Sequence, residues 1–186
     1  MSSRRRRTGA ASKRRQQARR NQMMIYGTVG LVVVGLIGVV AYMLLDRGPD
    51  LGKKFEDQGN VHLSAEPPEY LWNSHPPTSG PHAPNITNWG VHAESVPEWL
   101  QVHNLEDGGV IIHYNCPEGC PDIVEQLEEI ARDVDDDMER IVLHPYEEMD
   151  STIAVTAWTR MITMDEVDSE KITEFIEAYR GIDHHK

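Results

Sequence analysis

The sequence predicts a mixed α/β domain that follows a single transmembrane helix, and three features of the 186-residue chain lead to this prediction. Residues 23–45 form an uncharged apolar run. Residues 66–97 contain seven of the eleven prolines, a density that excludes a long helix or a central strand there. Between residues 110 and 181, short β-branched runs alternate with segments of helical periodicity, as expected for strands and helices layered around one core.

The N-terminal part divides into a basic tail, residues 1–22, and a membrane span, residues 23–45. A helix of this length is roughly 35 Å long, enough to cross a hydrocarbon layer of about 30 Å with some tilt. The first 20 residues carry nine Lys and Arg and no acid, so the positive-inside rule predicts a cytoplasmic N-terminus and an extracytoplasmic C-terminal part. We therefore expect a single-pass protein of the cell membrane that contacts the lipid bilayer through the span. A signal peptide is the alternative, but the apolar run is longer than its usual hydrophobic region and no small-residue cleavage site follows.

Charge and length define the rest of the chain. After residue 20 the chain holds nine Lys and Arg against 30 Asp and Glu. An acidic exterior repels nucleic acid, and topology together with anionic lipid explains the basic tail, so no nucleic-acid partner is expected. We assign residues 46–64 to a linker, residues 65–183 to one extracytoplasmic domain and residues 184–186 to a tail.

The predicted elements of the domain follow a proline-rich loop layer and a short helix or turn at residues 98–105. Strands are expected at residues 110–114, 140–143, 152–158 and 160–164, and helices at residues 122–134 and 168–179. The strands are predicted from apolar, β-branched runs and the helices from apolar residues three and four positions apart. The order is therefore β-α-β followed by β-β-α. A parallel β-α-β unit, an antiparallel pair and a closing helix make up a thioredoxin-like fold, which is the fold we predict.

The only two cysteines lie in the turn between the first of these strands and the first long helix. Cys116 and Cys120 are four positions apart, so one turn holds both sulfurs. The loops after two parallel strands lie at the same sheet edge, so His144 is expected beside them. Three roles are open: thiolates that bind a metal such as Cu(I), a structural disulfide, or a dithiol for redox exchange. The spacing argues against the third role, because thioredoxin-like catalysts use C-x-x-C.

Histidines in and after the loop layer are further candidate metal ligands. His75 and His82 lie between prolines that fix the loop backbone, and a rigid backbone is what a preorganised site requires. His103 and Glu106 are three residues apart and share one face of a helix. The simpler interpretations are loop histidines bonded to backbone and a polar pair at the end of the helix. Residues 184–185, both histidine, are interpreted as a frayed tail.

Two resemblances to known families bear on fold and function. The segment Tyr114–Asp122 resembles the Sco family of membrane-anchored copper chaperones, in which a C-x-x-x-C-P pair and a later histidine on a thioredoxin fold bind copper. Three blocks, His75–His82, His103–Val110 and Ala154–Arg160, resemble the bacterial domain-of-unknown-function family 3105. Members of that family are typically small anchored or secreted proteins without an assigned activity. A second histidine usually stands where Asp107 is here, and a carboxylate can still ligate a metal.

The residues and the Sco resemblance together predict a membrane-anchored protein that binds or delivers copper, with a membrane oxidase or another membrane complex as a partner. Cys116 and Cys120 would supply thiolates and His144 an imidazole, with the loop and helix histidines as alternative ligands. One alternative is an accessory subunit of a membrane complex with a structural disulfide, and a weaker one is a thiol-disulfide oxidoreductase. The chain has no nucleophile elbow, phosphate-binding glycine loop or H-E-x-x-H pattern, so an ordinary hydrolase or nucleotide enzyme is not expected, and a protein that is not an enzyme is the favoured interpretation.

Overall fold

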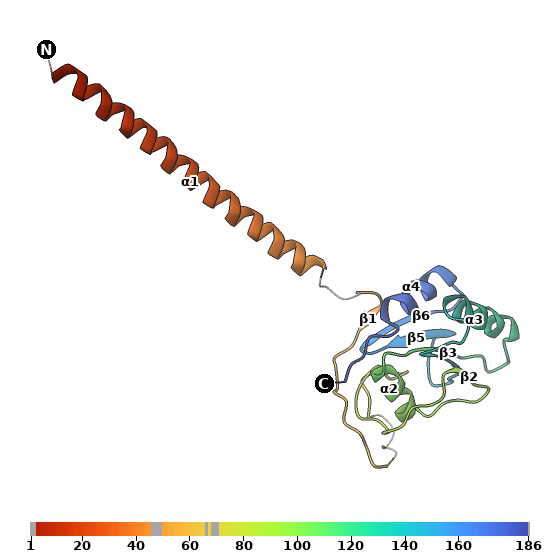
Figure 1. The fold of residues 1–186 in the computed structure, drawn as a ribbon. Coiled ribbons are helices and arrows are strands. Elements are labelled where there is room, and N and C mark those ends of the chain that lie inside the picture. The colour runs from red at the N-terminus through yellow and green to blue at the C-terminus, as the bar shows by residue number, and fades with distance from the viewer. Residues whose placement is uncertain (1–2, 46–49, 66, 68–70, 186) are drawn as a thin grey trace. The chain divides into compact units, whose positions relative to one another are not determined.

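The computed structural model describes residues 3–45, 50–65, 67 and 71–185, and the chain divides into two compact units, Met1–Gly48 and Pro49–Lys186. The first unit contains helix α1 (Ser3–Leu45) (Figure 1). Among the described residues, one helical segment, Arg19–Val39, is long and apolar enough to cross a membrane. A helix of this kind near an N-terminus is either a membrane span or a signal sequence. The predicted start of the linker, residues 46–49, lies outside the described residues.

In the described part of the chain, the second unit is built on a six-stranded sheet with strand order β1-β6-β5-β3-β4-β2. The strands are β1 (Lys53–Lys54), β2 (Gly90–Val91), β3 (Val110–Tyr114), β4 (Ile141–Pro145), β5 (Ile153–Ala157) and β6 (Arg160–Met164). Strand β4 runs parallel to β3, β5 antiparallel to β3, and β6 antiparallel to β5. The four central strands confirm the elements predicted from the apolar, β-branched runs.

Helices cover both faces of this sheet (Figure 1). They are α2 (Glu98–Glu106), α3 (Pro121–Val134) and α4 (Ser169–Tyr179). Successive residues of a strand point to opposite faces, so Val110 and Ile112 pack in the core beneath α3 and α4. Ile111 instead packs with Val102 and Leu105 of α2 in a second core on the opposite face. Both sides of the central strands are therefore buried, as their continuous apolar sequence predicts.

The two long helices begin where their sequences predict. Pro121 occupies the first turn of α3, where its missing N–H needs no partner. The side chain of Asp168 caps α4 by accepting a hydrogen bond from the backbone N–H of Lys171 at 3.1 Å. These two starts place α3 directly after the cysteine turn and α4 directly after β6.

The proline-rich segment forms the predicted loop layer beside α2. In its described part, residues 67 and 71–97, the one strand is the two-residue β2, which pairs in parallel with β4. Trp72 and Val96 are buried in the core that α2 covers. A parallel bridge joins His62 to His82, with hydrogen bonds from His82 N to Val61 O at 3.0 Å and from Leu63 N to His82 O at 2.7 Å.

Residues 50–64 belong to the second unit and correct the linker predicted over residues 46–64. Lys53–Lys54 forms the edge strand β1, which pairs antiparallel with β6. Leu51 packs against the core, and its N–H donates to the Tyr179 hydroxyl at 2.8 Å. Backbone pairing at a sheet edge needs no periodic side-chain pattern, so this polar, glycine-containing stretch gave no signal.

Candidate metal centre

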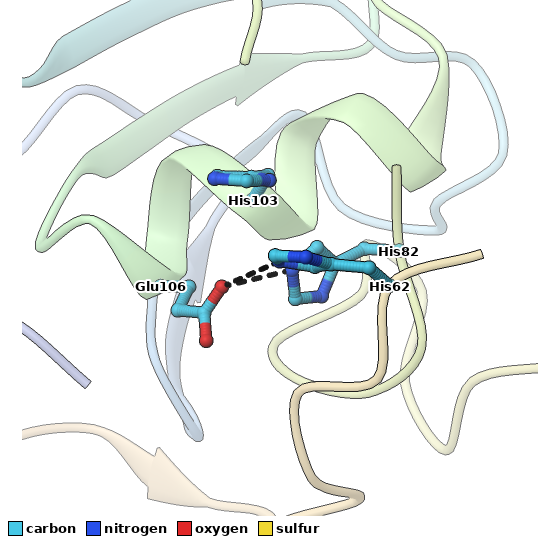
Figure 2. A group of neighbouring side chains, drawn as sticks. All are labelled: His62, His82, His103 and Glu106. Atoms are coloured by element: carbon cyan, nitrogen blue, oxygen red, sulfur yellow. Dashed lines mark hydrogen bonds and ion pairs between the residues drawn. The ribbon is translucent and has the colours of Figure 1, made fainter. Parts of the chain in front are cut away.

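Four potential metal ligands converge on the face of the second unit that carries α2 (Figure 2). They are His62, His82, His103 and Glu106, called here the inner set, and their ligand atoms all lie within 4.8 Å of one another. Oε2 of Glu106 lies 2.9 Å from Nε2 of His82 and 3.4 Å from Nε2 of His62. The side chains of His82 and Glu106 are 0% and 1% exposed, whereas that of His62 is 45% exposed. The inner set is therefore mostly buried and opens to solvent at His62.

Backbone structure brings these four residues together. His103 and Glu106 are three residues apart on α2, so one helical face presents both side chains. The parallel bridge between His62 and His82 places two loop histidines next to each other, with ring centroids 4.9 Å apart. The ring of His103 stacks on that of His62 at a centroid distance of 5.0 Å. A helix and two loops thus supply the inner set.

Hydrogen bonds to backbone carbonyls orient two of the imidazoles. Nδ1 of His82 lies 2.7 Å from the carbonyl oxygen of Gly80, and Nδ1 of His103 lies 2.7 Å from that of Ala83. A carbonyl oxygen only accepts, so Nδ1 carries the hydrogen in both rings. In a neutral imidazole the lone pair is then on Nε2, which faces the cluster. Histidines that bind metals are commonly fixed in this way.

The charges at the centre leave two electron-pair donors facing each other. Burial lowers the pKa of His82, even though Gly80 and Glu106 act in the opposite direction, which favours the neutral ring. Burial also raises the pKa of Glu106, but hydrogen bonding from Asn60 and the surrounding imidazoles outweigh it and bring that pKa below its ordinary value. Asn60 Nδ2 donates to Oε1 of Glu106 at 2.6 Å, which holds the carboxylate in place. A neutral Nε2 and a carboxylate oxygen 2.9 Å apart both present lone pairs, and either a proton held between them or a metal ion beside them would satisfy both.

A second group of ligands adjoins the first. It consists of His103, Asp107 and His185, called here the outer set. Nε2 of His185 lies 3.6 Å from Oδ1 of Asp107 and 3.5 Å from Oε2 of Glu106. Residues 184–185, predicted to be a frayed tail, are therefore ordered against the site, because backbone hydrogen bonds hold the end of the chain near α2. Lys186 lies outside the described residues.

His75 belongs to a different group from His82 and His103. Its ligand atom lies near those of Glu98 and Glu148, and Nδ1 of His75 is 3.3 Å from Oε1 of Glu98. The Tyr146 hydroxyl donates a short hydrogen bond to the same carboxylate. The prolines around His75 and His82 fix the loop, but the two imidazoles lie in different ligand groups.

The cysteines and His144 do not meet in a ligand group. Cys116 and Cys120 form a disulfide, which is one of the alternatives that the sequence left open. His144 is buried, pairs in register with His113, and its Nδ1 lies 2.7 Å from the carbonyl oxygen of Pro145. Burial lowers the pKa of His144 to about 4. The groups of three or more potential ligands among the described residues include neither cysteine and not His144.

Sequence reasoning found half of the inner set as candidate ligands. His82 and His103 were candidates from residue type and loop rigidity, and Glu106 was noted only as the partner of His103. His62 was missed because a lone histidine in a polar stretch carries no pattern. Only its residue type could have indicated His62 as a ligand. The chain has nine histidines, so each could have been considered as a candidate.

Comparison with known proteins identifies the family. A family model described as "Protein of unknown function (DUF3105)" matches residues 65–186. The match includes all of the inner set except His62, and it includes the outer set. Neither the curated proteins nor the solved structures contain a match to this chain. The chain belongs to the DUF3105 family.

Proposed function

We propose that the second unit binds one borderline divalent transition-metal ion through the inner set. The observation that carries this proposal is the environment of His82, whose two ring nitrogens both face oxygen atoms that accept hydrogen bonds. A neutral imidazole has a single N–H, and the carbonyl of Gly80 takes it. A metal ion at Nε2 balances the carboxylate of Glu106 in place of the contacts that His82 and His62 make with it, and it leaves the Nδ1 hydrogen bonds of His82 and His103 to the backbone intact.

The ligand types favour copper and zinc among the common metals. Imidazole nitrogens with one carboxylate suit Zn²⁺ and Cu²⁺, and four ligands match the usual coordination number of zinc. The Irving–Williams order makes Cu²⁺ the tighter of the two. Copper therefore stays our proposal, as Cu²⁺ rather than the Cu(I) expected of a thiolate site, because the sulfurs of Cys116 and Cys120 are bonded to each other.

The surrounding architecture supports a membrane-anchored role. The strand order β6-β5-β3-β4, with a parallel β3-α3-β4 unit and α3 and α4 on one face, supports the thioredoxin-like assignment. The apolar segment of α1 after a basic tail supports an anchor with a cytoplasmic N-terminus and an extracytoplasmic metal centre. We propose that an anchored metal centre of this kind binds the ion for, or delivers it to, a membrane complex such as an oxidase.

The test uses the full chain purified in detergent micelles and stripped of metal with a chelator. Titration with Cu²⁺ and with Zn²⁺, followed by desalting and elemental analysis, should give one ion per chain. The His82→Ala variant should bind at least about 100-fold more weakly, because it loses a buried ligand. His92→Ala is the matched control, since the Nε2 of His92 contacts the carbonyl oxygen of Asn88 and His92 is in none of the ligand groups.

Two outcomes would overturn the proposal. The first is a wild-type chain that retains no ion after desalting. In that case the accessory subunit with a structural disulfide becomes the remaining proposal. The second is a His82→Ala variant that binds as tightly as wild type, which would place the ion elsewhere in the chain.

A further inference from the structure

The C-terminal segment docks beside the metal centre through several backbone contacts. The N–H of Gly181 donates to the carbonyl oxygen of Gly108 at 2.7 Å, and the N–H of His184 donates to that of Glu106 at 2.9 Å. The ring of His184 stacks on Trp158 with centroids 5.6 Å apart. These contacts run along the end of α2 and hold the last described residues against it.

Gly108 is what allows this close approach. Its φ is +79°, and a Cβ added there would lie 2.8 Å from both N and O of Ile182. Any larger residue would push the C-terminal segment away and strain its own backbone. The sequence of α2 and its turn is therefore adapted to receive the end of the chain.

The imidazole of His185 is oriented toward the carboxylates of the site. Both its backbone N and its Nδ1 lie 2.8 Å from Oδ1 of Asp183. In the neutral ring, a carboxylate that holds Nδ1–H leaves the lone pair on Nε2, and the carboxylate–histidine–metal arrangement in many metal sites has this form. Nε2 of His185 then lies 3.6 Å from Asp107 Oδ1 and 3.5 Å from Glu106 Oε2.

The inner and outer sets share one ligand nitrogen, that of His103, and this limits the number of ions that the two sets can bind at the same time. His103 belongs to both sets, and its Nδ1 is held by the carbonyl oxygen of Ala83 at 2.7 Å. Only the lone pair on Nε2 remains, and one lone pair binds one ion. The inner and outer sets are therefore alternative positions for a single ion. They differ in access, because the side chains of His185 and Asp107 are 47% and 32% exposed while those of His82 and Glu106 are buried.

We propose that the outer set is the position through which the ion enters and leaves the inner set, by ligand exchange around His103. The proposal rests on the proposed function of the inner set. In each step one metal–ligand bond forms as another breaks: Glu106, His82 and His62 replace Asp107, His185 and a bound water as the ion moves inward, and the reverse occurs on release. His103 remains bound throughout, and the oxidation state of the ion does not change.

Exchange rates test this proposal, and Trp158 provides the signal. Its ring lies 6.4 Å from that of His82, centroid to centroid, so Cu²⁺ in the site should quench its fluorescence. Stopped-flow mixing of the metal-free full chain in detergent with Cu²⁺ measures loading, and mixing of the loaded chain with excess EDTA measures release. His185→Ala should slow both rates about tenfold, and the dissociation constant should change much less because both rates fall together. Asp183→Asn should slow them less, since it loosens the orientation of His185 and keeps the imidazole, and His92→Ala should leave both unchanged.

Each result that contradicts the exchange proposal leads to a different conclusion. A His185→Ala variant that loads and releases at wild-type rates overturns the outer position and leaves exchange through the exposed His62 side. Two ions per wild-type chain would show two separate sites instead of alternative positions. Loss of binding in His185→Ala would make His185 a ligand of the resting site. A wild-type chain without any bound ion, by contrast, overturns the proposed function itself.

Discussion

Glu106→Gln distinguishes a metal site from a buried ion pair between Glu106 and a protonated His82, because the two predict opposite changes in the stability of the metal-free chain. The new amide oxygen still accepts from Asn60 Nδ2, as Oε1 does at 2.6 Å. The new NH₂ group takes the place of Oε2, 2.9 Å from His82 Nε2, and donates to its lone pair. One buried hydrogen bond gained is worth about 1 kcal/mol, so the metal-free variant should be more stable by about that amount. A broken buried ion pair would instead cost about 3–5 kcal/mol.

With metal present, the wild-type chain should be more stable than Glu106→Gln. At a free ion concentration of about 100 times the dissociation constant, binding stabilises the wild-type chain by about 2.7 kcal/mol. For a domain of this size, about 1 kcal/mol corresponds to about 4 °C in Tm, so the wild-type Tm should rise by about 11 °C. Glu106→Gln removes the anionic ligand of the inner set. If affinity falls about 100-fold, the same ion concentration stabilises the variant by about 0.4 kcal/mol, or about 2 °C.

The assay is thermal unfolding of the full chain in detergent, followed by near-ultraviolet circular dichroism, with and without Cu²⁺. Glu128→Gln is the matched control, because it removes the same charge from a side chain of α3 that is 37% exposed and pairs with Arg132. Its Tm and its response to Cu²⁺ should stay close to wild type, within about 0.5 kcal/mol. A metal-free Glu106→Gln chain that unfolds well below wild type would refute the reasoning, as would one that keeps the full stabilisation by Cu²⁺.

Two further predictions concern residues outside the proposed metal centre. His144 is fully buried, and burial lowers its pKa to about 4. Between pH 6.5 and pH 4 the unfolded chain therefore binds a proton that the folded chain excludes. The free energy of unfolding should fall by about 3 kcal/mol on acidification through this range. Urea unfolding at pH 7, 5.5 and 4 should show a smaller loss in His144→Gln, and an equal loss in both chains would contradict this. Replacement of both Cys116 and Cys120 by serine should lower the free energy of unfolding by about 2 kcal/mol, since the closed loop is short. The same variant should bind as many divalent ions as wild type, and loss of the ion on elemental analysis would return the metal site to the cysteines.

The regular elements were predictable because each is encoded in its own segment. The apolar run at residues 110–114 and the helical spacing after Pro121 coincide with β3 and α3. Asp168 predicted the start of α4, and it caps that helix. Strands β1 and β2 could not be predicted, because two residues show no alternation and their pairing depends only on backbone position at the sheet edge.

The candidate site was less predictable, because strand geometry and loop contacts decide which side chains meet. His144 lies inside strand β4 (Ile141–Pro145) and not in the loop after it, and the pleat turns it to the face where the N–H of Val96 contacts its Nδ1 at 3.3 Å. It is therefore buried beside His113, with ring centroids 4.8 Å apart, instead of joining the cysteines in a ligand group. The sequence indicated suitable ligand types, and among the described residues the ligand groups contain His75, His82 and His103 but not Cys116, Cys120 or His144.

The sequence by itself determined the apolar N-terminal helix, the order of the central strands and helices, and the family. Each depends on local periodicity, composition or matched blocks of residues, all of which can be read along the chain. Only the tertiary structure decided the ligand set, because His62, His82 and the α2 residues come from separate segments. The inner set converges through a backbone bridge between two loops, and the outer set also needs a C-terminal segment that Gly108 allows to approach α2. Such contacts between distant segments leave no periodic signal in the sequence, and they are what assembles the proposed metal centre.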